Sequence, residues 1–141
     1  MTSALHIPKD FADKIVEHCR GGVPNEACGL LASRDGAVVE VLTMTNASAS
    51  PLRYSLDPTE QFAAYKKIEE EGWELAAVFH SHTRTAAYPS PTDVRLAVEP
   101  VPYVIVSLAQ EPPVVKAFLI HKEDFRDERG HVEEVPVIVD G

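Results

Sequence analysis

Two histidines separated by one residue, His80 and His82, are the feature of this sequence best suited to chemistry. They end the segment 74–82, whose apolar run LAAVF is typical of a buried strand. Side chains two apart on a strand point to the same side of a sheet, so both imidazoles could ligate one metal ion. Asp93 follows a proline-marked helix start at 90–92 and could return as an oxygen ligand. Two histidines and one carboxylate would leave an open position on a tetrahedral Zn²⁺ ion, as in catalytic zinc sites.

Each of these residues also has an ordinary structural explanation. A His-X-His pair can form a partly exposed polar face of a strand. Ser90 can be a helix N-cap, and Asp93 in the first helical turn can interact favourably with the helix dipole. The joint pattern of His-X-His, seven residues, Ser, two residues and Asp is much rarer, and chance would supply it in fewer than about one in a thousand such chains. The combination therefore favours a metal site.

The joint pattern resembles the JAMM motif of the MPN-plus metalloproteases, in which a glutamate precedes the His-X-His pair. Here that glutamate is Glu26 in the segment NEACGLLAS, just after the first predicted helix. The segments NEACGLLAS, MTNASASPLRYSLDP and HSHTRTAAYPSPTD are more narrowly similar to the small bacterial branch that works on ubiquitin-like sulfur-carrier proteins. That branch includes a peptidase that releases cysteine from the C-terminal glycine of the carrier. The resemblance extends over nearly the whole chain.

The resemblance implies a role for each residue of the motif. His80, His82 and Asp93 would hold one Zn²⁺ ion per chain, and the ion would activate a water molecule as the nucleophile. Glu26 would accept the proton of that water and pass it to the leaving amine. Ser90 would donate a hydrogen bond to the oxyanion of the tetrahedral intermediate. The ligand types alone would also suit Fe²⁺ or Co²⁺.

Without the motif, Glu26 would be interpreted differently. A glutamate at the start of a strand is usually a solvated or ion-paired surface residue. Cys28, two residues further on, is predicted to be a small core residue rather than a nucleophile, and Cys19 is predicted to lie on the apolar side of the first helix. No Cys-His-Asn pattern is evident, and two cysteines cannot make a disulfide framework.

Residues that contact the substrate are predicted in two segments. In similar proteins, the region between the glutamate strand and the His-X-His strand lies beside the groove for the carrier's extended C-terminal tail, and an exposed strand edge could add that tail as another strand. Each of the candidate residues could instead have an ordinary role in a turn or strand. The sequence lacks room for the long insertions of relatives that bind polyubiquitin. The candidates are Thr45, Asn46, Arg53, Tyr54, Arg84 and Tyr88.

Composition limits the classes of protein to which the chain can belong. Its 141 residues predict one domain over 1–141, and 13 basic against 22 acidic residues give a formal charge of −9. Such an acidic chain is poorly suited to bind nucleic acid, which needs a basic face. The sequence shows no apolar run long enough to span a membrane and no basic leader at its N-terminus. We therefore expect a cytoplasmic protein that does not engage a membrane.

The elements that must position these residues follow from apolar periodicity and turn signals. We expect helices over 8–20, from 58 to a stop at Gly72, and over 91–99. We expect strands over 27–32, 38–45, 53–56, 74–82, 103–108, 114–120 and 132–139, with a hairpin turn at Asp35-Gly36. This order predicts an α/β (α+β) fold, a mixed sheet flanked by about three helices. The resemblance implies the cytidine-deaminase-like MPN sandwich.

Two functional hypotheses follow. The first is a zinc metallopeptidase that cleaves after the C-terminal glycine of a ubiquitin-like sulfur-carrier protein ending in Gly-Gly and releases cysteine. Trimming of the carrier's C-terminus or cleavage of an isopeptide bond, as by a deubiquitinase, are enzymatic alternatives. The second is a noncatalytic MPN scaffold that binds other proteins. The complete set of motif residues favours the enzyme, because scaffolds of this family usually lack part of it.

Overall fold

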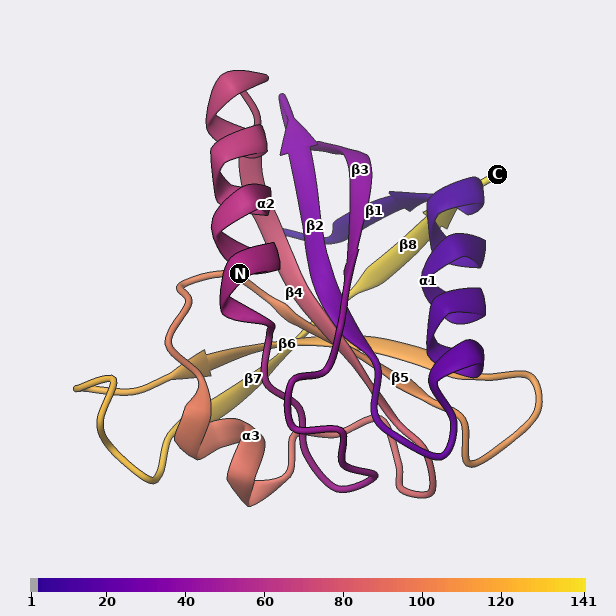
Figure 1. The fold of residues 1–141 in the computed structure, drawn as a ribbon, viewed down its shortest axis with the longest axis vertical. Helices are drawn as coiled ribbons and strands as arrows, with labels where there is room; N and C mark the ends of the chain where they lie inside the picture. Colours follow the sequence, from indigo (N-terminus) through magenta and orange to yellow (C-terminus); the bar gives the residue numbers. More distant parts are fainter. Residues whose placement is uncertain (1–2) are drawn as a thin grey trace.

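The computed structural model describes residues 3–141, which form a mixed α/β fold (Figure 1). In chain order the elements are β1 (Leu5–Pro8), α1 (Lys9–Gly22), β2 (Cys28–Arg34), β3 (Ala37–Met44), α2 (Pro58–Glu70), β4 (Glu74–His82), α3 (Pro91–Leu96), β5 (Tyr103–Ser107), β6 (Val114–His121), β7 (His131–Val135) and β8 (Val137–Asp140). The main sheet has the strand order β3-β2-β4-β5-β6-β7, and β1 and β8 form a separate parallel pair. Within the main sheet β4 and β5 are parallel and the other neighbours are antiparallel. The predicted mixed sheet with three helices is confirmed.

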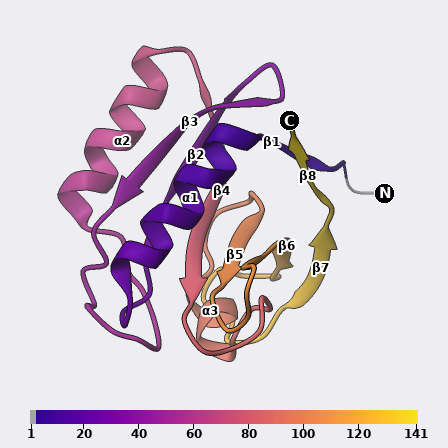
Figure 2. The same cartoon turned by 90° about the vertical axis from the view of Figure 1, so that its right-hand side faces the viewer.

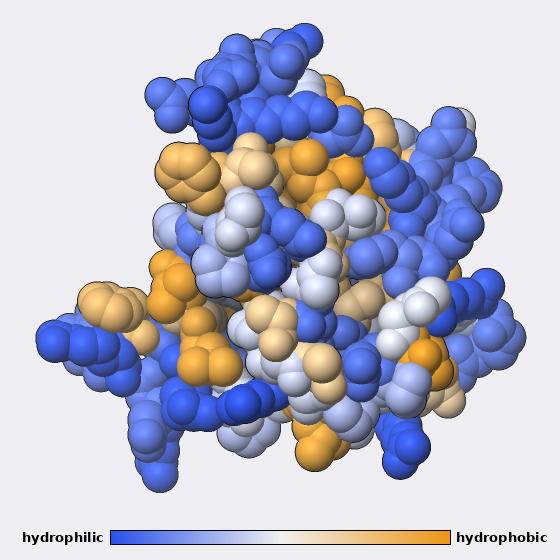
Figure 3. All heavy atoms as spheres, in the orientation of Figure 1, coloured by the Kyte–Doolittle hydropathy of each residue, from blue (hydrophilic) through white to orange (hydrophobic). Residues whose placement is uncertain are grey.

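Helices pack on both faces of the sheet: Figure 1 shows α2 and α1 on either side of β2 and β3, and in Figure 2 α1 lies in front of these strands. One core lies between α1 and the sheet, and it contains Ile15, Cys19, Leu31, Phe79 and Val104. The other core lies on the α2 side, and it contains Leu30, Met44, Ala64, Val78 and Tyr103. Hydrophilic side chains cover α1 and the upper part of α2, with hydrophobic ones between them (Figure 3). The sheet is therefore a central layer between two helical layers.

This layering decides which way the side chains of β4 point. Phe79 belongs to the α1 core and Val78 to the α2 core, because successive residues of a strand alternate between faces. By the same alternation, His80 and His82 lie on the α2 side, whereas Ser81 lies on the α1 side. All three side chains are buried. The period of the strand thus separates the two imidazoles from the serine between them.

The predicted hairpin turn and the predicted end of the second helix are confirmed by backbone geometry, and a side-chain cap fixes the start of that helix. Asp35 and Gly36 have φ values of 52° and 82°, as a tight hairpin turn between β2 and β3 requires. Asp57 caps α2, since its Oδ1 accepts a hydrogen bond of 3.0 Å from the backbone N–H of Glu60. Gly72 follows α2 with a φ of 71°, a left-handed conformation that favours glycine.

The ends of the chain differ from the sequence-based prediction. The segment Leu5–Pro8 forms β1, which was not expected, and pairs with β8. The predicted strand over 132–139 is divided at Pro136, so β7 pairs with β6 and β8 pairs with β1. The Pro136 carbonyl accepts a hydrogen bond from the N–H of Leu5 at 2.8 Å, which links the two ends of the chain. Pairing between such distant segments has no local signal.

Three element boundaries also shift. Helix α1 continues through Gly21 to Gly22, two residues beyond the predicted end. The predicted strand 53–56 is absent from the described residues, where only an isolated bridge joins Asn46 to Leu56. Helix α3 ends at Leu96 rather than near Glu99. The backbone N–H groups of Val98 and Glu99 instead donate to the Tyr103 hydroxyl, at 3.1 and 3.0 Å.

Lys122 closes the C-terminal end of α3. Its ammonium group donates to the carbonyl groups of Val94, Arg95 and Ala97 at 3.0, 2.9 and 3.0 Å. These contacts satisfy carbonyl groups that a helix end otherwise leaves unpaired. In residues 3–141 no helix combines the length and the apolar character needed to cross a lipid bilayer.

Candidate active site

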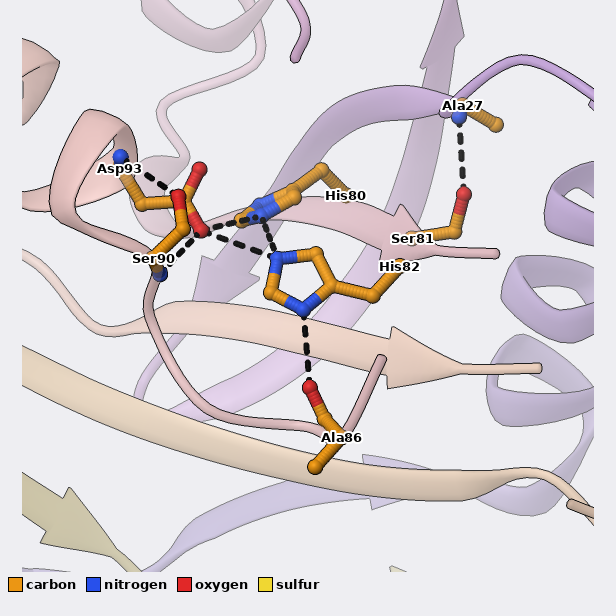
Figure 4. Close-up of polar contacts among 7 residues, drawn as sticks. All are labelled: Ala27, His80, Ser81, His82, Ala86, Ser90 and Asp93. Atoms are coloured by element: carbon orange, nitrogen blue, oxygen red, sulfur yellow. Dashed lines mark hydrogen bonds and ion pairs between the residues drawn. The ribbon is translucent and has the colours of Figure 1, made fainter. Parts of the chain in front are cut away.

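Three side chains from β4 and α3 converge on one point (Figure 4). The Nε2 atoms of His80 and His82 lie 3.1 and 3.0 Å from Oδ2 of Asp93, and they lie 3.2 Å from each other. All three residues are buried. Within residues 3–141, His80, His82 and Asp93 form the one group of three or more histidine, cysteine or acidic side chains that could hold a metal ion.

The local sequence explains why Asp93 reaches the histidines. Ser90 is the N-cap of α3, with Pro91 in the first turn. The Ser90 Oγ accepts a hydrogen bond from the Asp93 N–H at 3.0 Å, and Asp93 Oδ2 accepts one from the Ser90 N–H at 2.9 Å. This reciprocal capping box orients the carboxylate before any metal binds. The structural explanation for Ser90 and Asp93 is therefore correct, and it is compatible with a metal site.

The chemistry of the three atoms fits a bound cation. His82 donates from Nδ1 to the Ala86 carbonyl at 2.8 Å, which leaves its Nε2 as an acceptor when the ring is neutral. Two imidazole nitrogens and a carboxylate oxygen this close together could all ligate one cation. Ligands at the usual Zn–N distance on a tetrahedral ion lie about 3.3 Å apart, close to the separations found here.

The electrostatics of the site favour the ligand forms of Asp93 and His80, but not that of His82 in the absence of a metal. Although burial opposes it, hydrogen bonds from His80 and His82 hold the pKa of Asp93 well below its usual range. Burial, only partly offset by Asp93, lowers the pKa of His80. Burial would also lower the pKa of His82, but its hydrogen bonds to Asp93 and the Ala86 carbonyl raise it overall. A carboxylate and neutral imidazoles are the forms that bind metals.

Glu26 lies beside this cluster with its carboxyl group unpaired. It is 5% exposed, and its Oε1 atom has no hydrogen-bond partner. Burial raises the pKa of Glu26 to about 7, with a lowering effect from His82 and a raising effect from Asp93. A carboxyl group with a pKa near neutrality is well suited to accept and return a proton. The surface explanation for Glu26 is thus wrong, since the side chain is buried.

The backbone of Glu26 is held from two sides. The Glu26 N–H donates to the Ser50 carbonyl at 2.9 Å, and the Asn46 side chain donates to the Glu26 carbonyl, also at 2.9 Å. The N–H of the next residue, Ala27, donates to the Ser81 Oγ at 2.9 Å (Figure 4). The Ser81 N–H in turn donates to the Ala27 carbonyl at 3.0 Å. Sequence reasoning missed Ser81; its position between the two histidines was the available signal.

A cleft of about 420 Å³ opens onto the site. It gives access to three residues of the motif, and a cleft of this size can admit an extended peptide end. It is lined by Pro24, Glu26, Pro51, Leu52, His82, Thr83, Arg84, Thr85 and Ser90. Of the six predicted substrate-contacting residues, Arg84 is the one among these.

The other predicted substrate residues lie around the site rather than in the cleft. The Asn46 side chain orders its own loop. Besides its bond to Glu26, its Nδ2 donates to the Arg53 carbonyl at 3.0 Å. Its Oδ1 accepts from the backbone N–H groups of Ser48 and Ser55, at 3.0 Å each. The Arg53 side chain is exposed. Thr45 is held by Glu60, which accepts from its N–H and its hydroxyl.

The two tyrosines among these candidates pack against other rings. Tyr54 stacks on His80 with ring centroids 4.3 Å apart and an interplanar angle of 21°. It therefore supports a residue of the metal cluster directly. Tyr88 is exposed and packs edge-on against Phe118, with centroids 5.4 Å apart. A substrate contact by either ring stays a prediction.

The two cysteines are core residues, as predicted. Cys19 and Cys28 are both free and fully buried, in the α1 and α2 cores respectively. Burial raises the pKa of each thiol to about 12. Neither is therefore suited to act as a thiolate nucleophile.

Most of the chain, residues 8–121, matches the family of prokaryotic homologs of the JAB domain. The chain belongs to this family. A CysO-cysteine peptidase of Mycobacterium tuberculosis is 37% identical over 140 residues, covering 96% of this chain and 90% of the relative. A probable TtuB-protein conjugate cleaving protease of Thermus thermophilus is 37% identical over 117 residues, covering 82% of this chain and 76% of that protein. This JAB protein is accordingly a hydrolase of the JAMM peptidase type.

Two solved structures are also similar to this chain. The solution structure of protein DSY2949 from Desulfitobacterium hafniense matches with a TM-score of 0.83 and 40% identity, over 96% of this chain and 92% of that one. A structure described as a JAMM metalloprotease-like zinc site in the proteasome and signalosome matches with a TM-score of 0.55 and 16% identity, over 96% and 99% of the two chains. The second likeness concerns the fold alone. It confirms the predicted JAB/MPN fold.

Proposed function

We propose that this JAB protein is a zinc-dependent peptidase that hydrolyses the bond after the C-terminal glycine of a ubiquitin-like sulfur-carrier protein and releases cysteine. The observation that carries the proposal is the convergence of His80, His82 and Asp93 beside an unpaired, buried Glu26. The two curated relatives described above, one named for a CysO-cysteine substrate and one for TtuB conjugates, support this class of substrate. The proposal includes one catalytic domain over 1–141 that works in the cytoplasm, in keeping with two free cysteines.

In this proposal Glu26 moves the protons. Its carboxylate accepts a proton from the attacking water as the new C–O bond forms at the glycine carbonyl. The same carboxyl group then delivers that proton to the leaving nitrogen, so that the C–N bond breaks with its electron pair retained by the amine. A pKa near 7 allows Glu26 to act in both directions close to neutral pH.

His80, His82 and Asp93 would hold the metal. A Zn²⁺ ion bound there would supply a Lewis acid for the scissile carbonyl and lower the pKa of a neighbouring water. The hydrogen bond from His82 to Ala86 fixes the ring with Nε2 toward Asp93, and the capping box fixes the carboxylate. The ligand set is therefore oriented by the protein itself.

Ser90 would stabilise the oxyanion. Its Oγ accepts the Asp93 N–H, so the hydroxyl proton remains available to donate, and the residue lines the cleft. A donor already oriented toward developing negative charge lowers the barrier of acyl transfer. An unfolded Gly-Gly tail of the carrier has no side chains beyond hydrogen, which suits a cleft partly lined by Pro24, Pro51 and Leu52.

Intact-mass analysis of a carrier that ends in Gly-Gly-Cys tests the proposal. The carrier is incubated with zinc-loaded protein, with chelator-treated protein and with the Glu26→Gln variant. We expect loss of one cysteine residue with the zinc-loaded protein alone. An unchanged carrier mass, with zinc shown to be bound, would overturn cysteine release. A larger mass loss would instead indicate trimming of the carrier.

A further inference from the structure

We propose that Arg84 binds the free α-carboxylate of the leaving amino acid, and so makes this enzyme prefer release of a C-terminal residue over cleavage of a lysine isopeptide bond. This inference rests on the proposed function and specifies the leaving group that the site accepts. Arg84 lines the cleft together with Glu26, His82 and Ser90. Among the described residues that line the cleft, it is the one with a permanent positive charge.

The guanidinium of Arg84 is available for a ligand. Its side chain is exposed, and within residues 3–141 no carboxylate lies within ion-pair distance of it. Two other arginines are ion-paired, Arg20 with Glu111 at 2.7 Å and Arg126 with Asp124 at 3.0 Å. Within residues 3–141, Arg53 and Arg95 also lack an ion pair, so what distinguishes Arg84 is its place in the cleft. Glu26 shares the cleft but forms no ion pair with Arg84, so the proposed general base leaves the guanidinium free to bind a substrate carboxylate.

Charge makes this free cation informative. The protein carries a formal net charge of −9. A substrate carboxylate that binds beside Glu26 is therefore repelled by the net charge of the protein and by the Glu26 carboxylate. An unpaired guanidinium in the same cleft offsets that repulsion locally. Its planar fork can also bind a carboxylate through two parallel hydrogen bonds.

Covalent geometry places an α-carboxylate within this cleft. In a C-terminal residue, the leaving nitrogen and the carboxylate carbon are both attached to the α-carbon. The nitrogen and the carboxylate carbon are therefore about 2.5 Å apart. Because Glu26 must reach that nitrogen, the carboxylate has to lie in the cleft that Glu26 and Arg84 share. A lysine isopeptide presents only methylene groups at this position, since its nitrogen is at the end of the side chain. Arg84 would therefore distinguish the two leaving groups.

Paired substrates test the inference. One carrier ends in Gly-Gly-Cys with a free carboxylate, and the other ends in the same residues with a C-terminal carboxamide. We expect Arg84→Gln to lower kcat/KM for the acid by about 10- to 100-fold, and to leave that for the amide nearly unchanged. Arg84→Lys should restore part of the loss, since it keeps the charge without the fork. Arg129→Gln, which removes an exposed arginine outside the cleft, is the control for net charge.

A binding measurement gives a readout without turnover. In the Glu26→Gln background, isothermal titration should show tighter binding of the acid-ended carrier, and Arg84→Gln should remove that preference. If Arg84→Gln affects both carriers equally, or neither, the inference is overturned while the proposed peptidase stands. If wild-type protein cleaves neither carrier yet binds the acid through Arg84, the proposed function fails and the carboxylate site stands.

Discussion

The side-chain amide of Asn46 donates a hydrogen bond of 2.9 Å to the backbone carbonyl of Glu26. Asn46 lies just after β3, and the same side chain makes hydrogen bonds that order the loop as far as Ser55. In the same loop, the Ser50 carbonyl accepts a hydrogen bond from the Glu26 N–H. A residue that sequence similarity placed near the substrate is thus bonded to the backbone of the proposed general base.

Asn46→Ala should therefore act on kcat rather than on KM. Loss of the bond to Glu26 allows its carboxyl group to move, and misplacement of a catalytic group by about 1 Å costs up to about 100-fold in rate. Faster amide hydrogen exchange at Glu26 and Ser55 should accompany the loss. Ser48→Ala removes a loop contact to Ser55 without touching Glu26 and is the control. A raised KM with an unchanged kcat would show instead that Asn46 contacts the substrate.

Glu26→Gln should abolish most of the activity while the protein stays folded and metal-bound. The amide has nearly the same size and cannot take the proton from water, and general acid–base catalysis contributes about 10²- to 10⁴-fold. Metal content by mass spectrometry and steady-state hydrolysis of the carrier give the two readouts. Wild-type rates in this variant would favour a scaffold, for which the carboxyl group has no use.

The pH dependence of stability in metal-free protein should also depend on Glu26. Burial raises its pKa from 4.5 to about 7, so the folded protein keeps a proton that the unfolded chain loses. The contribution of this carboxyl group to the free energy of unfolding therefore falls as pH rises from 4.5 to about 7, and is constant above that. Glu26→Gln removes this fall.

Melting temperatures of chelator-treated protein between pH 5 and pH 8, roughly the range in which the shift acts, measure the effect. The variant should gain stability relative to wild type toward pH 8. Glu69→Gln, which changes an exposed glutamate on α2, should follow the wild-type curve. Parallel curves for wild type and Glu26→Gln would contradict the buried carboxyl group.

Ser90→Ala should separate the two roles of Ser90. Loss of the N-cap of α3 should cost about 1 kcal/mol in the free energy of unfolding. Loss of an oxyanion donor should lower kcat by about 10²- to 10³-fold. Asp57→Ala removes the N-cap of α2 and is the matched control, with a similar loss of stability and normal activity. Equal activities for the two variants would leave Ser90 with a capping role alone.

Asp93→Asn should weaken zinc binding by more than about 100-fold, because it removes the negative charge of the ligand set and keeps its shape. The amide oxygen can still accept the Ser90 N–H, so α3 should keep its N-terminal turn. Competition with a chromogenic chelator measures the affinity, and Glu26→Gln provides a variant with wild-type affinity. Unchanged zinc affinity in Asp93→Asn would exclude Asp93 as a ligand.

The sequence by itself determined the parts of the site that depend on local periodicity. His80 and His82 share a face because side chains alternate along β4, and Asp57 and Ser90 begin helices because they precede Pro58 and Pro91. These patterns act over a few residues, so they can be recognised along the chain. Glu26, by contrast, was identified only through the resemblance to the JAMM motif.

Only the tertiary structure decided how distant segments support these residues. The burial of Glu26, its bond to Asn46, the stacking of Tyr54 on His80 and the place of Arg84 in the cleft all depend on contacts between separate segments. The pairing of β1 with β8 is of the same kind. Such contacts are set by how the sheet and its two helical layers pack, and polar side chains in loops carry no periodic signal that would reveal their partners.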